Sequence, residues 1–392
     1  MRILQVFNQY LEPGGEEVWV NQVLGMSKPG MVLEDLRFQS GTWLGKSAPH
    51  RFQQAALLWN NPNSRRLLRE RVEAFRPNVL LFHNLIPVAS LGLYDEARQL
   101  GLPVVQYIHN FRPFSPSGTL WVRNRVIDAA LHGNPWPEVL SRGWERSFFK
   151  TALLAVQQQR LIRSGKLDVV RRWIAISDFM RDRFVEAGIA EDRIVTLHHC
   201  WQSRFPLSGT REGGHYLFLG RLVPEKGVHS MIDAWALLEQ ELGPKCPRLV
   251  IAGTGAEEAK LHLRANHLRS VTCVGFVTGA VKQDLIDRCR AVLAPSIWWE
   301  PLGLIVHEAY NSARPVIAAR SGGLTETVQH EVTGLLHEPG NAHALVAEVM
   351  KLEQLGEQGR HAMGLAGRAW LESHASPAHW QEKFHAIMAS VK

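Results

Sequence analysis

The sequence predicts two doubly wound α/β domains. Short apolar runs alternate with longer amphipathic segments along the 392 residues. Strands that are apolar throughout and separated by helical stretches are typical of parallel sheets covered on both faces. The length also exceeds what one hydrophobic core usually supports, so two domains of about 200 residues each are expected. Two facing domains of this kind leave a cleft at the carboxyl ends of their strands, where ligands usually bind.

The expected strands fall into two series. The first comprises residues 2–7, 79–83, 103–109, 173–177 and 194–199, and the second comprises 216–220, 248–253, 271–275, 291–296, 315–319 and 333–337. Between the series, the polar stretch 202–215 contains glycines and a proline and marks the boundary. We therefore expect Rossmann-like domains at 1–205 and 206–392. Trp380, Phe384 and Ile387 have helical spacing, so a terminal helix, about 376–392, should close the fold and could pack back on the first domain.

Composition indicates a soluble cytoplasmic protein. The apolar fraction is 45% and the charged fraction 21%, as in ordinary globular proteins. The start, MRILQVFNQY, resembles a buried strand and has no cleavage site, and no apolar run reaches the ~18 residues of a membrane span. Four cysteines without CxxC spacing are expected to be reduced thiols.

The positive charge is confined to the first half of the chain. Residues 1–210 hold 26 Lys and Arg against 18 Asp and Glu, a net charge of +8, whereas residues 211–392 hold 18 against 19, a net charge of −1. This asymmetry suggests an anionic partner for one domain only. A membrane surface, a phosphate-bearing acceptor and, less well, nucleic acid fit that description.

The first glycine-rich turn lies in NQYLEPGGEEVWVNQV, residues 8–23. Gly14 and Gly15 would let the backbone approach a ligand, and the start of the following helix offers unpaired N–H groups to a phosphate. The alternative is an ordinary strand-to-helix turn whose acidic residues favour the helix dipole.

A second such turn carries cations, in YLFLGRLVPEKGVHSMIDAW, residues 216–235. Arg221 can bind two phosphate oxygens at once, and Lys226 supplies a compact charge beside a glycine at a helix start. The alternative is a solvated loop of mixed charge, but the spacing favours phosphate binding.

Two glutamates lie on either side of an apolar stretch in SIWWEPLGLIVHEAYNSARPVIA, residues 296–318. Glu300 would lie in the loop after a strand, and Glu308 about a turn and a half into the next helix. Carboxylates can accept hydrogen bonds from vicinal hydroxyls, as in sugars and ribose, and the amides of Leu302 to Leu304 could hold a phosphate or a hydroxyl. Two surface glutamates are the alternative, which fits the apolar neighbours poorly.

Together these motifs resemble the family 4 retaining glycosyltransferases of GT-B fold. The matching residues are the E-x7-E pair of Glu300 and Glu308, GRLVPEKG, PGGEE, LVIAGTGAEE (249–258), VGFV (274–277) and SGGLTETV (321–328). The stretch YIHNFRPFSPSG (107–118) resembles the HN loop of the subgroup that begins with PGGE. The resemblance covers nearly the whole chain.

The resemblance implies a role for each matched residue. Arg221 and Lys226 would neutralise the departing nucleotide diphosphate, Glu308 would hold the ribose, and Glu300 and His109 would face the donor sugar. The remaining expected contacts are Gly14 and Gly15 with phosphate in the first, acceptor-binding domain, Gly253, Gly255 and Val277 near the base, and Leu302, Gly303 and Leu304 at the sugar and phosphate.

Some positions depart from the family pattern. Leu302 replaces an aromatic residue, Ala313-Arg314 replaces an expected glycine, and His198-His199-Cys200 stands where asparagine and glycine are common. The family typically needs no metal or other cofactor, and none is expected here. A metal at His198 and His199 is disfavoured because adjacent residues on a strand point to opposite faces.

The segment 141–173 combines basic residues with Trp144, Phe148, Phe149 and Leu153. It is expected to be a helix whose apolar face packs internally. The alternative is a basic amphipathic surface that binds anionic lipid head groups, which the charge of this domain keeps open.

The sequence therefore predicts a cytoplasmic retaining glycosyltransferase, peripheral on the membrane in the lipid-binding alternative. It would transfer a sugar from a UDP- or GDP-sugar to a saccharide or a lipid-pyrophosphate-linked saccharide in bacterial cell-surface polysaccharide synthesis. A non-catalytic sugar-nucleotide sensor or scaffold on the same fold is the main rival. A nicotinamide-dependent oxidoreductase lacks the G-x-G-x-x-G signature, and a nucleic-acid binder lacks any motif beyond charge.

Overall fold

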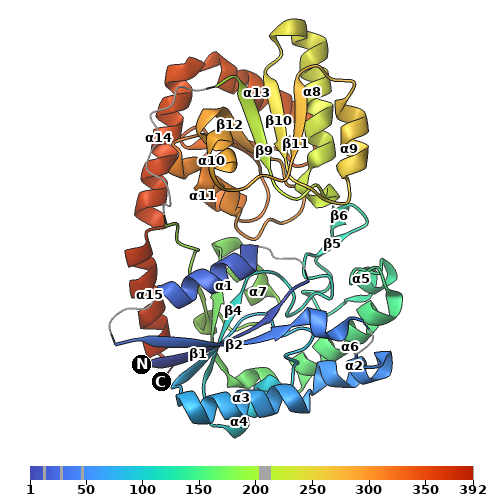
Figure 1. Cartoon of the computed structure of the whole chain (residues 1–392), viewed down its shortest axis with the longest axis vertical. Helices are drawn as coiled ribbons and strands as arrows, with labels where there is room; N and C mark the ends of the chain where they lie inside the picture. Colours follow the sequence, from blue (N-terminus) through green and yellow to red (C-terminus); the bar gives the residue numbers. More distant parts are fainter. Residues whose placement is uncertain (12–14, 27–29, 46–47, 203–212, 392) are drawn as a thin grey trace. The chain divides into compact units, whose positions relative to one another are not determined.

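The computed structural model describes residues 1–392 except 12–14, 27–29, 46–47, 203–212 and 392. The chain divides into two compact units (Figure 1). The first unit is Met1–Val122, Ile127–His199 and Pro377–Lys392, and the second is Arg123–Val126 and Cys200–Ser376. The expected boundary at residues 205 and 206 lies outside the described residues.

A six-stranded parallel sheet forms the centre of the first unit. Its order is β2-β1-β3-β4-β7-β8. The strands are β1 (Arg2–Gln9), β2 (Val32–Gln39), β3 (Val79–Phe82), β4 (Val104–Ile108), β7 (Val170–Ala175) and β8 (Ile194–Thr196). All five strands expected here are present, and β2 was missed. This edge strand, VLEDLRFQ, is mostly half-buried and carries three charged residues, so it lacks the continuous apolar run of a central strand.

The helices of the first unit connect these strands. They are α1 (Gly15–Gly25), α2 (Arg51–Trp59), α3 (Pro62–Phe75), α4 (Leu93–Gln99), α5 (Trp136–Leu140), α6 (Phe148–Arg163) and α7 (Asp178–Glu186), with short 3₁₀ helices η1 (Ser40–Trp43), η2 (Lys166–Val169) and η3 (Glu191–Arg193). The chain also has the two-residue strands β5 (Trp121–Val122) and β6 (Arg125–Val126).

The second unit has its own six-stranded parallel sheet, in the order β11-β10-β9-β12-β13-β14. Its strands are β9 (His215–Leu219), β10 (Arg248–Ala252), β11 (Val271–Gly275), β12 (Cys289–Ala294), β13 (Val316–Ala319) and β14 (Gly334–His337). Every strand expected in this half of the chain is present. The continuous apolar runs predicted them because both faces of this sheet are covered.

Helices cover both faces of the second sheet (Figure 1). One buried cluster contains Met231 and Trp235 of α8, Leu261 of α9 and Leu345 of α13, and another contains Val306 of α11. The helices are α8 (Val228–Leu242), α9 (Glu258–Ala265), α10 (Gly279–Arg288), α11 (Leu304–Asn311), α12 (Leu324–Thr327), α13 (Ala342–Gln354) and α14 (Gly356–His374), with η4 (Pro224–Lys226) and η5 (Gly243–Lys245).

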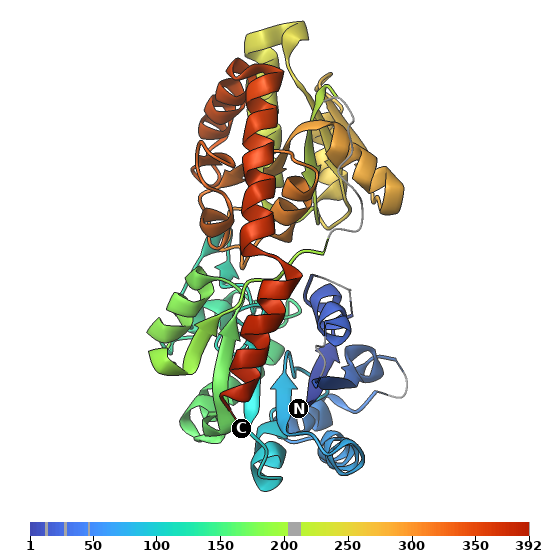
Figure 2. The same ribbon diagram turned by 90° about the vertical axis from the view of Figure 1, so that its left-hand side faces the viewer.

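The last helix, α15 (Pro377–Ala389), is grouped with the first unit and is drawn in red in Figure 2. Trp380 meets Trp19 of α1 edge-on, with ring centroids 5.3 Å apart, and the amide of Gln381 donates to the Met26 carbonyl at 3.1 Å. Trp380 and Phe384 are buried as their spacing predicted, and Met388 rather than Ile387 completes the buried face.

Candidate active site

The strand order of the second unit creates a switch point at β9 and β12. β10 pairs with one edge of β9 and β12 with the other, so the chain leaves this point in opposite directions. Ligands usually bind at the carboxyl ends of strands at such a point. The loops after β9 and β12 meet here, since the amide of Ile297 donates to the Glu225 carbonyl at 2.9 Å. The basic motif and the first glutamate of the E-x7-E pair are therefore neighbours.

Glu300 is held by three donors at this switch point. Its Oε2 accepts from Lys226 Nζ at 2.6 Å, Ser296 Oγ at 2.8 Å and Trp298 Nε1 at 2.9 Å, and the side chains that the structure describes offer no donor to Oε1. Burial raises the pKa of this carboxyl, but the charge of Lys226 and the three hydrogen bonds outweigh burial and hold the pKa below its ordinary value. Glu300 is therefore an ionised carboxylate with one oxygen already engaged.

Arg221 differs from Lys226 in having no such partner. It follows β9 by two residues and is exposed, and no ion pair joins it to any residue in the described ranges. Lys226, by contrast, is neutralised by Glu300 and lies 5.4 Å from the centroid of the Trp298 ring. The switch point thus presents one unpaired cation and one cation held in place by a buried carboxylate.

Gly253 and Gly255 are required by the packing of the protein itself. A Cβ at Gly253 would lie 1.8 Å from the Gly220 carbonyl oxygen, and one at Gly255 would lie 2.4 Å from that of Leu222. The loop after β10 therefore packs directly on the loop after β9. These glycines hold the cationic loop in place, and their contact with a nucleotide base stays a prediction, as does that of the half-buried Val277.

The second glutamate of the pair is also engaged. Glu308 lies in α11, and Lys282 Nζ of α10 is 2.6 Å from its Oε2. α11 begins at Leu304. The two residues before it are the buried Leu302 and then Gly303, which has a φ of 86°. The expected amides thus lie at a helix start, and the carboxylate expected to hold ribose carries a neutralising lysine.

In the first unit, Gly14 lies outside the described residues, and Gly15 is the exposed first residue of α1. Beside it, Glu16 accepts hydrogen bonds from the Tyr10 hydroxyl at 3.0 Å and from Asn110 Nδ2 at 3.1 Å. Burial raises the pKa of the Glu16 carboxyl to about 7, although the Tyr10 hydrogen bond opposes the shift. A titratable carboxyl therefore lies at the carboxyl ends of β1 and β4.

His109 follows β4 and is 8% exposed. Its Nε2 is 2.8 Å from Nδ1 of His83, which follows β3, and His83 Nε2 is 3.1 Å from Gln5 Oε1 on β1. His83, Gln5 and Glu16 were not singled out from the sequence. A signal for His83 was available, because a polar residue ending an apolar strand, as in VLLFH, lies at the ligand-binding edge of a parallel sheet.

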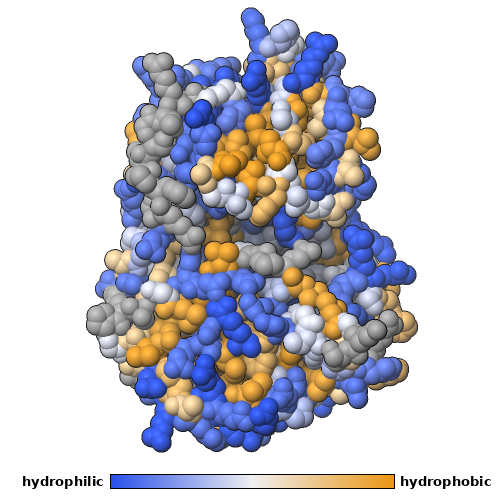
Figure 3. Space-filling model, in the orientation of Figure 1, coloured by the Kyte–Doolittle hydropathy of each residue, from blue (hydrophilic) through white to orange (hydrophobic). Residues whose placement is uncertain are grey.

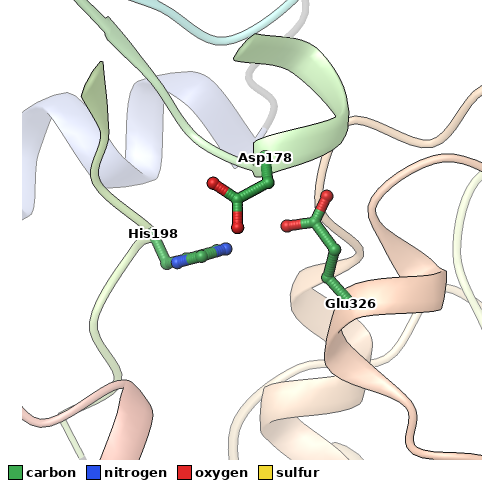
Figure 4. Close-up of side chains that lie close together, drawn as sticks. All are labelled: Asp178, His198 and Glu326. Carbon is green, nitrogen blue, oxygen red and sulfur yellow. The ribbon is translucent and has the colours of Figure 1, made fainter. Parts of the chain in front are cut away.

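His198 and His199 lie beyond β8, which ends at Thr196, so their expected alternation along a strand is wrong. The His199 ring stacks on Trp19, with centroids 4.0 Å apart. His198 faces Asp178, the first residue of α7, within 4.8 Å; Figure 4 also draws Glu326, which belongs to α12 of the second unit. Two side chains of one unit do not make a metal site, so we assign none to them.

The sequence and the fold resemble glycosyltransferases. Residues 205–370 match the family model described as Glycosyl transferases group 1. The chain is 34% identical over 134 residues to an uncharacterized glycosyltransferase of Methanocaldococcus jannaschii, covering 33% of each chain. It is 28% identical over 312 residues to the alpha-D-kanosaminyltransferase of Streptomyces kanamyceticus, covering 76% of this chain and 72% of that protein.

Among solved structures, Anabaena HepE in complex with UDP superposes with a TM-score of 0.70 at 18% identity, and both chains are covered completely. The same neighbour was also solved with UDP-glucose. Two doubly wound units and this neighbour show the GT-B fold. Together the comparisons support a glycosyltransferase. The chain spans only a third to half of the length of several curated relatives that it matches.

Proposed function

We propose that this chain is a retaining glycosyltransferase that uses a nucleotide-diphosphate sugar. The observation that carries the proposal is the switch point of the second unit, where the unpaired Arg221 lies on the same loop as Lys226, and Lys226 is paired with the buried Glu300 of the loop after β12. The two cations can bind the negatively charged diphosphate, and Oε1 of Glu300 can accept a hydrogen bond from a sugar hydroxyl. UDP and UDP-glucose in the HepE crystals support this class of ligand.

In the proposed reaction, the bond between the anomeric carbon and the diphosphate breaks, and its electron pair leaves with the diphosphate. Arg221, Lys226 and the amides at the start of α11 stabilise that charge. The acceptor oxygen then bonds to the same face of the anomeric carbon, and its proton passes to the diphosphate. The protein contributes positioning and electrostatic stabilisation, and the two cations take the place that a metal ion has in other transferases.

Binding of nucleotide diphosphates tests this proposal. Millimolar UDP, GDP and their sugars should raise the melting temperature, because a ligand at 100 times its Kd stabilises the folded state by about 2.7 kcal/mol. We expect slow hydrolysis of the preferred nucleotide sugar without acceptor, with little effect of EDTA. The Arg221→Ala variant is the control for binding at this site, because it should show a smaller rise in melting temperature than wild type. No stabilisation by any nucleotide diphosphate would refute the proposal, and stabilisation without hydrolysis or transfer would favour the sensor alternative.

The acceptor in this proposal is a saccharide, and specifically a lipid-pyrophosphate-linked saccharide on an anionic membrane, bound by the first domain. Support comes from the α5–α6 surface, which comprises the exposed apolar residues Trp136, Leu140, Phe148, Phe149 and Val156 and the exposed arginines Arg142, Arg146 and Arg163. α6 packs internally through Leu154 and Leu161, but Phe148 and Phe149, which were expected on the packing face, are 39% and 83% exposed.

A groove of about 520 Å³ runs between α5 and α6, lined by Trp136, Val156 and Arg163 among others. Figure 3 shows hydrophobic residues among hydrophilic ones on the side of the first unit where Figure 1 places these helices. Apolar side chains beside arginines are the chemistry of binding to anionic lipid head groups. None of the helices within the described ranges is long and apolar enough to cross a bilayer.

Liposome binding tests the α5–α6 surface. Co-sedimentation should rise with the fraction of anionic lipid and fall with salt, because screening acts over about 10 Å at 0.1 M. Phe149→Ser should weaken binding several-fold. Phe276→Ser in the second unit, where the ring is 73% exposed, is the matched control and should bind as wild type. Equal binding to neutral and anionic vesicles, or equal loss in both variants, would exclude this surface as the membrane contact.

A further inference from the structure

A line of buried hydrogen bonds crosses three neighbouring strands of the first unit. Gln5 on β1 donates from Nε2 to the Val20 carbonyl at 3.1 Å, and its Oε1 faces His83 Nε2 at 3.1 Å. His83 Nδ1 in turn lies 2.8 Å from His109 Nε2. Gln5 and His83 are 0% and 1% exposed, so bulk water does not satisfy these atoms.

The donors and acceptors along this line can be assigned in order. A carbonyl only accepts, so the Val20 carbonyl fixes the amide of Gln5 with Nε2 toward Val20 and Oε1 toward His83. Oε1 also only accepts, so His83 must carry its proton on Nε2. The Nδ1 of a neutral His83 is then an acceptor, and His109 must donate to it from Nε2. His109 therefore has no proton on Nδ1.

Both rings are neutral, which this assignment requires. Burial lowers the pKa of His83 well below its ordinary value, and burial lowers the pKa of His109 to about 3. The His109 Nδ1 atom is buried and has no hydrogen-bond partner in the described parts of the chain. A buried acceptor left unpaired is costly, so this nitrogen needs a donor that the described residues do not supply.

We propose that Gln5 and His83 are positioning residues that hold His109 in the Nε2–H tautomer, so that its Nδ1 accepts a hydrogen bond from a hydroxyl group of a bound sugar. This inference rests on the proposed function. His109 also lines a cavity of about 40 Å³ together with His83, Glu16 and Asn110. Because Nδ1 has a lone pair and no proton, it would favour an O–H group over a group that only accepts.

The tautomer can be measured without any ligand. The ring nitrogens of the full-length protein, labelled with ¹⁵N at histidine, report by NMR which nitrogen carries the proton, and the His109→Asn and His83→Asn variants assign the two rings. We expect protons on Nε2 of both His83 and His109. A proton on His109 Nδ1, or a doubly protonated ring near neutral pH, would overturn the inference.

The role of Gln5 is tested by Gln5→Glu. A carboxylate at this position would favour a doubly protonated His83, whose Nδ1–H would then donate to His109 Nε2 and shift the His109 proton to Nδ1. Gln106→Glu is the matched control, since Gln106 is 3% exposed and its amide donates to the His83 backbone carbonyl rather than to the ring. An unchanged His109 tautomer in folded Gln5→Glu would refute the relay. If this variant does not fold, the wild-type spectrum still decides the tautomer.

Substituted sugars test the contact with a hydroxyl. UDP-glucose analogues with one sugar hydroxyl at a time replaced by fluorine or hydrogen are compared by calorimetry with UDP-glucose and UDP. At one position, both replacements should weaken binding at least about 10-fold, because neither can donate to Nδ1, while UDP binds unchanged. His109→Ala should abolish the difference.

If the fluorine analogues bind as well as UDP-glucose at every position, no hydroxyl donates to His109 and water fills its site. If no nucleotide diphosphate binds, the proposed function fails, whereas the NMR result on His109 is unaffected. The two failures are therefore distinguishable.

Discussion

Replacing Lys226 with alanine should weaken the binding of free UDP by about 1.5–3 kcal/mol, or about 10- to 150-fold, because a charge-assisted hydrogen bond to the diphosphate is lost. Sugar transfer should fall by at least about 100-fold, as when one group that stabilises a departing or developing anion is removed. Calorimetry with UDP and initial transfer rates measure the two effects. Lys260→Ala is the matched control, since Lys260 lies in the same unit and its side chain is 70% exposed.

The ion pair with Glu300 complicates this variant, because loss of Lys226 leaves a buried carboxylate without its cation. The double variant Lys226→Ala/Glu300→Gln removes both charges. It should recover thermal stability relative to Lys226→Ala while its affinity for UDP stays low. If UDP affinity recovers together with stability, Lys226 acts through the fold and not on the diphosphate.

Glu300→Gln alone keeps the shape of the side chain. It should leave UDP affinity nearly intact while lowering turnover, because Glu300 is expected to face the donor sugar. Full transfer activity in this variant would exclude that role and strengthen the sensor alternative.

Replacing Gly227 with alanine should unfold the second unit or destabilise it by about 2–5 kcal/mol, the sum expected for a left-handed residue with a Cβ and for forced overpacking. Gly227 has a φ of 71°, and its added Cβ would lie 1.9 Å from the Pro295 carbonyl oxygen. Thermal and urea denaturation, followed by circular dichroism, measure the loss.

Gly275→Ala separates the two causes. Gly275 also has a φ of 71°, but nothing lies within 4 Å of an added Cβ. The Gly275→Ala variant should lose only the stability that corresponds to the backbone strain, about 1–2 kcal/mol. Equal losses in the two variants would show that the contact with Pro295 does not matter and that strain alone explains the effect.

The sequence by itself determined the architecture, because both sheets are parallel and buried on both faces. Strands such as VLLF of β3 and VIAA of β13 are apolar throughout, and this pattern can be recognised in the sequence without knowing which strands lie beside them. The edge strand β2 was not predicted, because VLEDLRFQ is only partly buried and therefore lacks a continuous apolar run. The ordered motifs likewise identified Arg221, Lys226, Glu300, Glu308 and His109 as candidate site residues.

Only the tertiary structure decided how these residues are partnered. Lys226 and Glu300 are separated by 74 positions, and they meet because β9 and β12 are neighbours in the sheet although β10 and β11 lie between them in the chain. The same holds for Gln5 on β1, His83 directly after β3 and His109 directly after β4. A single sequence gives the order of strands along the chain but not their order in the sheet. The charge state of a side chain depends on which strand lies beside it, so the pairing of Glu300 and the tautomer of His109 could be derived only from the fold.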